Sequence, residues 1–264
     1  MGIEFPQAPN LQEQQQASLH EVVNFVMTAA QIIQRKSGKP LADVMHDYTI
    51  LHELVMRGDT PDANWKEYAE GLPQQSDPVA WTVKFIRDRN ALQQAPQESE
   101  FGCFTYVYKA KEQTIFMHFH NEDADHVSPL SEERRERRTK ELKRMFADIR
   151  EKHPEARDVR GFSWLYNIEA YKRLFPLSYT ASVSADKYPQ NIRSAGLWSQ
   201  FATADGHINH GRAQLFFARL EHVDMEHLED AFPLQVLAAH APIKDFYQFY
   251  GIEANKPSPL LPSK

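Results

Sequence analysis

Cysteine is almost absent from this chain, because Cys103 is the only one among 264 residues. A single cysteine cannot form a disulfide within the chain, and it also excludes a metal site built from several thiolates of one chain. Structural disulfides belong to oxidising compartments, whereas chains without them suit a reducing cytosol. We therefore expect a cytoplasmic protein.

Long apolar runs are missing as well. No stretch approaches the roughly 20 apolar residues that a helix needs to span a bilayer. The Gln-rich segment 11–16 lacks both the basic region and the continuous apolar region of a signal peptide. The sequence thus predicts neither export nor insertion into a membrane.

The chain also lacks an excess of basic residues. The 30 lysines and arginines are outnumbered by 36 aspartates and glutamates, and the formal net charge is -6. That balance gives no general attraction to nucleic acid or to anionic membranes. Because 42% of the residues are hydrophobic and 11% are aromatic, the chain can bury a full core. We expect a small-molecule substrate and no nucleic-acid or membrane partner, and the sequence leaves homo-oligomerisation open.

Helical periodicity dominates residues 1–95. Leu19, Val22 and Val26 recur at the spacing of one helical face, which predicts an amphipathic helix. Similar patterns follow along this region. We predict helices over residues 18–36, 41–57, 63–70 and 77–93.

Residues that typically begin or end helices mark the end of this helical region. Asp77 is a suitable N-cap, and Pro78 suits the first helical position. The segment 95–100 is polar and contains a proline, so it predicts a domain boundary. We expect a helical N-terminal region, an α/β domain with C-terminal helices, and a flexible proline-containing tail, at residues 1–95, 96–251 and 252–264.

Two histidines, His46 and His52, fall within the helix expected over 41–57. They are six residues apart, a spacing that puts their imidazoles on different faces of one helix. The two-histidine zinc motif on a helix needs ligands at i and i+4. This pair therefore does not predict a metal site.

Aromatic and β-branched runs begin after residue 100. Residues 101–109 and 114–120 predict two strands joined by a short polar turn. A long helix is expected over 128–152, since Pro154 disfavours helix in the residue before it. The pattern then predicts a strand over 158–167, a short helix over 168–175, extended segments over 179–184 and 196–203, a turn at 205–206, and helices over 211–221 and 234–250. The predicted class is α/β (α+β), with a mixed sheet flanked by helices.

His118 and His120 are the first candidate site. Lying two apart on a predicted strand, they point to the same face and can in principle chelate zinc or iron, with Asp123, Asp125 or His126 from the following loop. Alternatively, one histidine is a hydrogen-bonded core residue and the acidic run is a solvated loop. A general acid or base role for either imidazole needs no metal.

Arginines near the start of the helix over 128–152 are the second candidate. The apolar stripe of this helix continues toward its N-terminus onto Arg138 and Arg135, beside Arg134. Arginines there, near unpaired backbone N–H groups, can bind phosphate or carboxylate. The alternative is an ordinary charged surface with i,i+4 ion pairs.

The order strand, strand, long helix, strand, short helix, strand resembles the central and C-terminal half of the GNAT superfamily of N-acyltransferases. The local match Leu-Tyr-Asn-Ile-Glu-Ala-Tyr-Lys-Arg-Leu-Phe over 165–175 is similar to the fifth strand and following helix of that family. Ser163-Trp164-Leu165 also looks like an element of some divergent GNAT-like C-terminal domains. The resemblance covers about a third of the chain.

The resemblance implies that acyl-CoA lies between the fourth and fifth strands, with its pyrophosphate at the start of the helix over 128–152. In this chain the family's glycine-rich phosphate loop is replaced by the acidic segment 121–128, and Phe175 stands near the usual tyrosine acid. The cofactor-binding residues implied are Arg134, Arg135, Arg138 and Asn167.

The function implied is acyl transfer from CoA or a carrier thioester to an amine. His118 or His120 is the expected base, Tyr171 or Tyr179 is the expected acid, and acyl-CoA is the expected co-substrate with no resident metal. Two alternatives stay open. One is a metal-dependent enzyme that uses the histidine pair, and the other is a non-catalytic binding protein on a decayed acyltransferase scaffold.

Overall fold

The structure is a computed structural model that describes residues 11–56, 60–90, 99–123, 127–185 and 191–252. It divides into two compact units, each with its own core. The first unit comprises Met1–Gln97, Asp125–Ser128 and Lys187–Val236, and the second comprises Glu98–Ala124, Pro129–Asp186 and Leu237–Lys264. The tail expected to be flexible lies outside the described residues from 253 onward.

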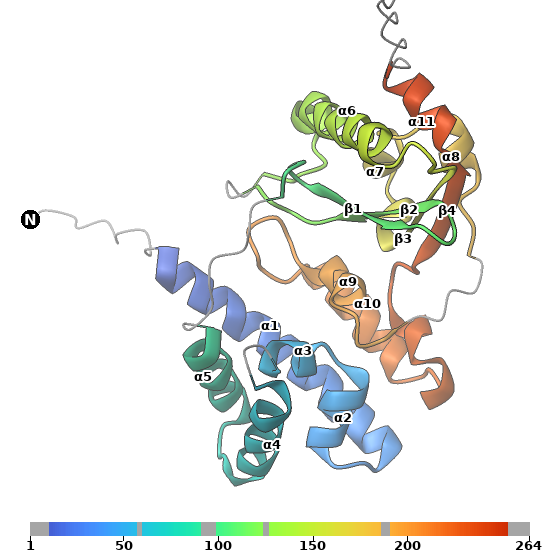
Figure 1. The fold of residues 1–264 in the computed structure, drawn as a ribbon. Helices are drawn as coiled ribbons and strands as arrows, with labels where there is room; N and C mark the ends of the chain where they lie inside the picture. The colour runs from blue at the N-terminus through green and yellow to red at the C-terminus, as the bar shows by residue number, and fades with distance from the viewer. Residues whose placement is uncertain (1–10, 57–59, 91–98, 124–126, 186–190, 253–264) are drawn as a thin grey trace, which may run out of the picture. The chain divides into compact units, whose positions relative to one another are not determined.

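The first unit is helical (Figure 1). Its central helix α1 buries Val23, Val26 and Ala30, which confirms the predicted apolar face. Asp77 accepts a hydrogen bond from the backbone N–H of Ala80 at 2.9 Å, as its predicted role as N-cap requires. The helices of the unit are α1 (Leu11–Ser37), α2 (Leu41–Tyr48), α3 (Leu51–Val55), α4 (Pro61–Gly71), α5 (Pro78–Asn90), α9 (Ala195–Trp198) and α10 (His210–Leu220).

The single helix expected over 41–57 is wrong, because the chain breaks between α2 and α3. Thr49 is extended there, with φ -133° and ψ 167°. Its hydroxyl donates to the carbonyl of Met45 at 2.7 Å and accepts from the backbone N–H of Leu51 at 3.1 Å. One side chain thus closes the end of α2 and caps the start of α3, which competes with helix continuation.

The chain from 187 to 236 packs with the N-terminal helices, whereas we expected it in the domain over 96–251. The reason is an aromatic core shared across the sequence. Phe25 of α1 lies 4.7 Å from Phe201 between ring centroids, and Phe216 lies 4.9 Å from Phe232. The extended segment expected over 196–203 is also wrong, since α9 begins at the Ser194 cap and continues as a 3-10 turn.

Lys36, at the end of α1, supplies a testable contact with the end of α10. Its Nζ lies 2.9 Å from the carbonyl of Leu220, 3.1 Å from that of Glu221 and 2.5 Å from that of Val223. We predict that Lys36→Met lowers the free energy of unfolding by about 1–2 kcal/mol in urea denaturation, because these carbonyls lose a charged donor.

Arg35→Met is the matched control. Arg35 is exposed and, within the described residues, forms an ion pair only with Glu221, so its loss is expected to cost less than about 0.5 kcal/mol. Equal effects of the two substitutions would contradict a specific role for Lys36.

The second unit is built on a four-stranded mixed sheet in the order β1-β2-β3-β4. The β1–β2 and β3–β4 pairs are antiparallel, and β2–β3 is parallel. The predicted hairpin is therefore confirmed. The strands are β1 (Phe104–Lys109), β2 (Thr114–Phe119), β3 (Asp158–Ser163) and β4 (Leu237–Pro242).

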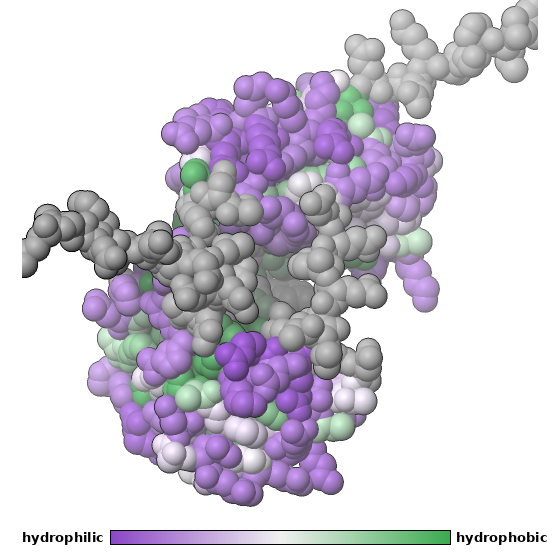
Figure 2. Space-filling model, turned by 90° about the vertical axis from the view of Figure 1, so that its left-hand side faces the viewer, coloured by the Kyte–Doolittle hydropathy of each residue, from purple (hydrophilic) through white to green (hydrophobic). Residues whose placement is uncertain are grey.

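Helix α6 (Arg135–Lys152) connects the two parallel strands and lies against one face of the sheet (Figure 1). The predicted apolar stripe is confirmed, because its four members Leu142, Met145, Phe146 and Ile149 are completely buried. Phe146 stacks on Phe246 of α11 (Ile243–Phe249) at 4.6 Å. The opposite, polar face of α6 agrees with the largely hydrophilic surface of this unit in Figure 2.

Three predictions from the end of β3 onward are wrong. The strand expected over 158–167 ends at Ser163, and residues 164–167 form a 3-10 turn. Residues 179–184 were expected to be extended, but α8 (Leu177–Ala181) begins directly after Pro176. Residues 234–250 were expected to form one helix, but their first half is β4. The alanine-rich run 238–241 has helical propensity, and pairing with β3 overrides it. Pro242 then precedes α11, and α7 (Glu169–Lys172) agrees with the short helix predicted over 168–175.

The protein therefore has a mixed architecture of the α+β class. Within the described part of the chain, none of the helices combines the length and apolarity required to cross a bilayer.

Candidate functional site

The two parallel strands of the second unit pair over only half of their length. The register joins Thr114 to Asp158, Ile115 to Val159, and Phe116 to Arg160, and it ends there. Residues 117–119 continue to pair with β1, and residues 161–163 continue to pair with β4. The carboxyl ends of β2 and β3 thus each pair only with their outer neighbour, and the carboxyl ends of parallel strands are where ligands of open α/β sheets bind.

A tyrosine cluster lies beside the carboxyl end of β3, in the core that the sheet shares with α6. The hydroxyls of Tyr166 and Tyr179 lie 2.6 Å apart, and a Cβ atom at Gly161 would meet them at 2.0 and 2.5 Å. Tyr171 packs between Tyr166 and Phe119, with centroid distances of 5.4 and 5.5 Å. Burial, reinforced by the neighbouring tyrosines, holds the pKa values of these three phenols well above their usual value, so they stay protonated.

The predicted bases lie on the other side. Because side chains alternate along β2, His118 points away from the face on which Phe119 meets Tyr171. His118 is exposed, and its pKa is lowered by partial desolvation and then by His120. His120 lies 3.5 Å from Glu122. The structure therefore does not bring the predicted bases into contact with Tyr171 or Tyr179, because opposite faces of one sheet separate them.

The predicted arginines converge on a loop carboxylate. Asp123 lies 2.5 Å from Arg134, 3.1 Å from Arg137 and 3.0 Å from Arg138, and its side chain is only 1% exposed. Arg138 is completely buried. The sequence offered two alternatives for Arg138, a free phosphate-binding residue or part of a solvated surface, and the structure shows neither. Its guanidinium binds an anion that the chain itself provides.

Glu141 completes this ion-pair cluster. It lies 3.1 Å from Nη1 of Arg138 and 3.2 Å from Nε of Arg137. The backbone N–H of Cys103 also donates to Glu141 at 3.2 Å, which connects α6 to the segment before β1. The sequence offered one signal for Glu141, its i+3 spacing from Arg138, and none for Asp123, whose position depends on how the loop folds.

The other predicted residues of this region have local contacts. Arg135 is exposed and pairs with Glu132 at 3.4 Å. Asn167 is exposed, and its amide donates to the carbonyl of Trp164 at 2.7 Å, within the 3-10 turn that follows β3. Cys103 is buried, and this burial raises the pKa of its thiol. These observations leave Arg135 as the predicted phosphate ligand whose charge faces solvent.

In the ranges that the structure describes, no three His, Cys, Asp or Glu side chains are arranged to hold a metal ion. Asp125 and His126, proposed from the sequence as further ligands for the histidine pair, lie outside those ranges.

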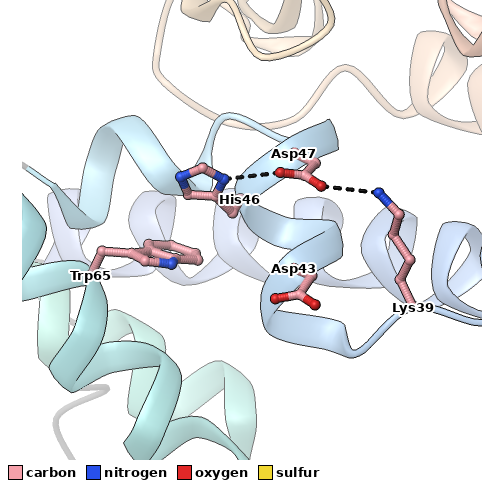
Figure 3. A pocket seen from close by; sticks show the side chains of 5 residues that line it. All are labelled: Lys39, Asp43, His46, Asp47 and Trp65. Atoms are coloured by element: carbon pink, nitrogen blue, oxygen red, sulfur yellow. Dashed lines mark hydrogen bonds and ion pairs between the residues drawn. The ribbon is translucent and has the colours of Figure 1, made fainter.

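The first unit contains a pocket of about 250 Å³ between α2 and α4. His46 and Asp47 form a hydrogen bond of 3.0 Å, and Asp47 also pairs with Lys39 at 3.1 Å (Figure 3). The indole of Trp65 packs beside the His46 imidazole at 5.1 Å between ring centroids. Asp43 completes the lining.

The break between α2 and α3 also brings His46 and His52 together. Their ring centroids are 5.8 Å apart, although a continuous helix would place them on different faces. Nε2 of His52 accepts from Nε of Arg193 at 3.3 Å, since a guanidinium can only donate. Its Nδ1 must then carry the proton and donate to the carbonyl of Thr49, at 2.7 Å. His52 is therefore held as the neutral imidazole.

This geometry predicts a pH effect. Burial, followed by the charge of Arg193, lowers the pKa of His52 despite its bond to Thr49. The unfolded chain binds the proton near pH 6.5 and the folded chain only at lower pH, so the stability contribution of neutral His52 declines as the pH falls below about 6.5. NMR titration of the histidine ring signals is expected to give His52 a pKa below 6.5, and a value at or above 6.5 would contradict this arrangement.

No family model matches the chain, and no match was found among curated proteins or solved structures.

Proposed function

We propose that the second unit is a GNAT-like acyltransferase domain that moves an acyl group from CoA or a carrier thioester to an amine. The observation that carries this is the parallel pair β2–β3, which stops pairing at Phe116 and Arg160 while α6 connects the strands. In the GNAT fold that the sequence resembles, the gap between such strands admits pantetheine. The helical part of the local match over 165–175 agrees with α7, whereas residues 165–167, which the resemblance expects at the end of a strand, form a 3-10 turn after β3.

His118 and Tyr171 lie on opposite faces of the sheet, and this placement suits a thioester that is inserted between the ends of β2 and β3. His118, on the exposed face, accepts the proton of the attacking amine, and its lowered pKa keeps it in the basic form near neutral pH. The amine nitrogen bonds to the thioester carbon, and the carbon–sulfur bond breaks. Tyr171, on the opposite face beside Phe119, donates a hydrogen bond to the leaving sulfur and keeps its proton, and the thiolate takes up a proton from solvent after it leaves. For this step the thioester must enter beside Phe119, because Tyr171 is buried.

Arg135 is the residue we assign to the phosphates. Arg134, Arg137 and Arg138 are already matched by Asp123 and Glu141, so an incoming anion would have to compete with two buried carboxylates. Arg135 lies at the first position of α6 and its weaker, exposed pair with Glu132 costs little to open.

Ligand-dependent thermal stability tests the binding step. Acetyl-CoA or a longer acyl-CoA at millimolar concentration is expected to raise the melting temperature by several degrees, and Arg135→Ala is expected to reduce that rise. Lys140→Ala is the matched control, because Lys140 is another exposed cation of α6. If no acyl-CoA stabilises the wild type, acyl transfer by this unit is excluded.

A transfer assay tests the chemistry. His118→Gln is expected to abolish acyl transfer to an amine while the thermal shift remains. His240→Gln, which changes an exposed histidine on β4, is expected to leave transfer unchanged. Equal losses in both variants would contradict a catalytic role for His118.

A non-catalytic binding protein on the same scaffold is the second candidate. It is favoured by the tyrosine hydroxyls that fill the space over Gly161 and by the carboxylate that occupies the arginine cluster. For this candidate we expect no stabilisation by any acyl-CoA, so the first experiment separates the two functions.

A further inference from the structure

We infer that the pocket of the first unit, lined by Lys39, Asp43, His46, Asp47 and Trp65, binds a small organic ammonium ion. This binding site is distinct from the acyltransfer residues of the second unit and does not depend on them.

Within the described residues, one of the two carboxylates in the pocket is paired and the other is not. Both oxygens of Asp47 are engaged, one by His46 at 3.0 Å and the other by Lys39 at 3.1 Å. Asp43, one turn earlier on the same face of α2, has no hydrogen bond or ion pair with any residue in the described part of the chain. Asp43 is exposed, so its carboxylate is the anion of the pocket that a cationic ligand can reach without breaking an ion pair.

Lys39 does not offer the pocket a free cation. Its Nζ lies 3.1 Å from Asp47 and 3.1 Å from the hydroxyl of Tyr48, and it sits over the Tyr48 ring at 4.9 Å. An anionic ligand would have to break these contacts. The accessible charge consequently favours a cation.

The remaining walls suit an ammonium ion with a short carbon chain. The indole of Trp65 provides the best aromatic surface for a cation. Nδ1 of His46 is bonded to Asp47, which leaves Nε2, within the described structure, to accept a hydrogen bond from the ligand. The side chains lie around one hollow in Figure 3, with Trp65 on α4 and the carboxylates on α2. A volume of about 250 Å³ is below the range typical of drug-sized ligands, so the ligand must be small.

An NMR titration tests this site on the intact chain. Butylammonium and tetramethylammonium are the probes, and butanol and tert-butanol are neutral controls of similar size, all at constant ionic strength. We expect the ammonium ions to shift the indole N–H signal of Trp65 in a saturable manner and to leave that of Trp81 in place. The alcohols are expected to produce no saturable shift. Equal responses to alcohols and ammonium ions would overturn the inference.

Charge-neutral variants identify the carboxylate. Asp43→Asn is expected to weaken ammonium binding about tenfold, which corresponds to about 1.4 kcal/mol. Asp88→Asn, which removes an equal charge from the exposed face of α5, is expected to change the affinity less than about twofold, since Asp88 does not line the pocket and surface charges act weakly at a distance. Unchanged binding in Asp43→Asn, equal weakening in both variants, or saturation by Mg²⁺ or Zn²⁺ in place of ammonium would each contradict the assignment.

Discussion

Replacing Asp123 by asparagine is expected to lower the opening free energy of α6 and β2 by about 3 kcal/mol, the largest effect we predict. The substitution removes the charge that faces Arg134, Arg137 and Arg138 and leaves the completely buried Arg138 with Glu141 alone. Removing one partner of a buried ion pair typically costs about 3–5 kcal/mol, because the other charge stays desolvated. The retained contact with Glu141 places our estimate at the lower end of that range.

Native-state hydrogen exchange is the suitable measurement, because it resolves α6 from the first unit. Glu136→Gln provides the control: Glu136 is exposed on the same helix and pairs with Lys140 at 2.7 Å. We expect a change below about 0.5 kcal/mol for that variant. If Asp123→Asn were equally mild, the buried cluster would contribute no more than a surface ion pair.

Replacing Gly161 by alanine is expected to destabilise β3 by about 3 kcal/mol. The new methyl group would lie 2.0 Å from the Tyr166 hydroxyl, 2.5 Å from that of Tyr179 and 3.2 Å from Cζ of Tyr166. Adding a methyl group to a close-packed core usually costs about 1–3 kcal/mol. We place this substitution at the upper end because both rings are buried and hold each other through a 2.6 Å hydrogen bond.

A double-mutant cycle separates this clash from a general effect on the strand. Tyr166→Phe removes the oxygen nearest to the new methyl group, so Gly161→Ala is expected to cost at least about 1 kcal/mol less in the Tyr166→Phe background. Urea unfolding of the four proteins measures the coupling. Strict additivity would contradict a direct clash between the methyl group and the hydroxyl.

Local patterns in the sequence predicted the elements whose stability is itself local. The stripe of α6 from Leu142 to Ile149, the Asp77 cap and the alternation across β1 and β2 all depend on residues within a few positions of one another. The prediction of one helix over 41–57 was wrong because the hydroxyl of Thr49 bonds to backbone groups on both sides of it. These bonds compete with those of a further helical turn. The same break brought His46 and His52 within contact.

The geometry of the candidate sites depends mainly on contacts between residues that are far apart in the sequence. Arg138 was recognised as part of the α6 face, but its partner Asp123 lies fifteen residues earlier, in a loop with no regular period. His118 and Tyr171 were both identified, yet the side of the sheet that each occupies is determined by the strand register and by where α7 packs. The sequence contained no signal for the pocket around Trp65, since that pocket requires α2 and α4 to lie side by side.

The sequence by itself determined the α+β class, the hairpin, the long crossover helix and its buried stripe, because hydrophobic periodicity and caps act over one or two turns. Only the tertiary structure decided that residues 187–236 join the N-terminal helices, that 237–242 form a strand, and that the arginines face carboxylates of their own chain. In each of these cases the deciding energy comes from aromatic packing, strand pairing or ion pairing between residues far apart in the chain, which no local pattern records.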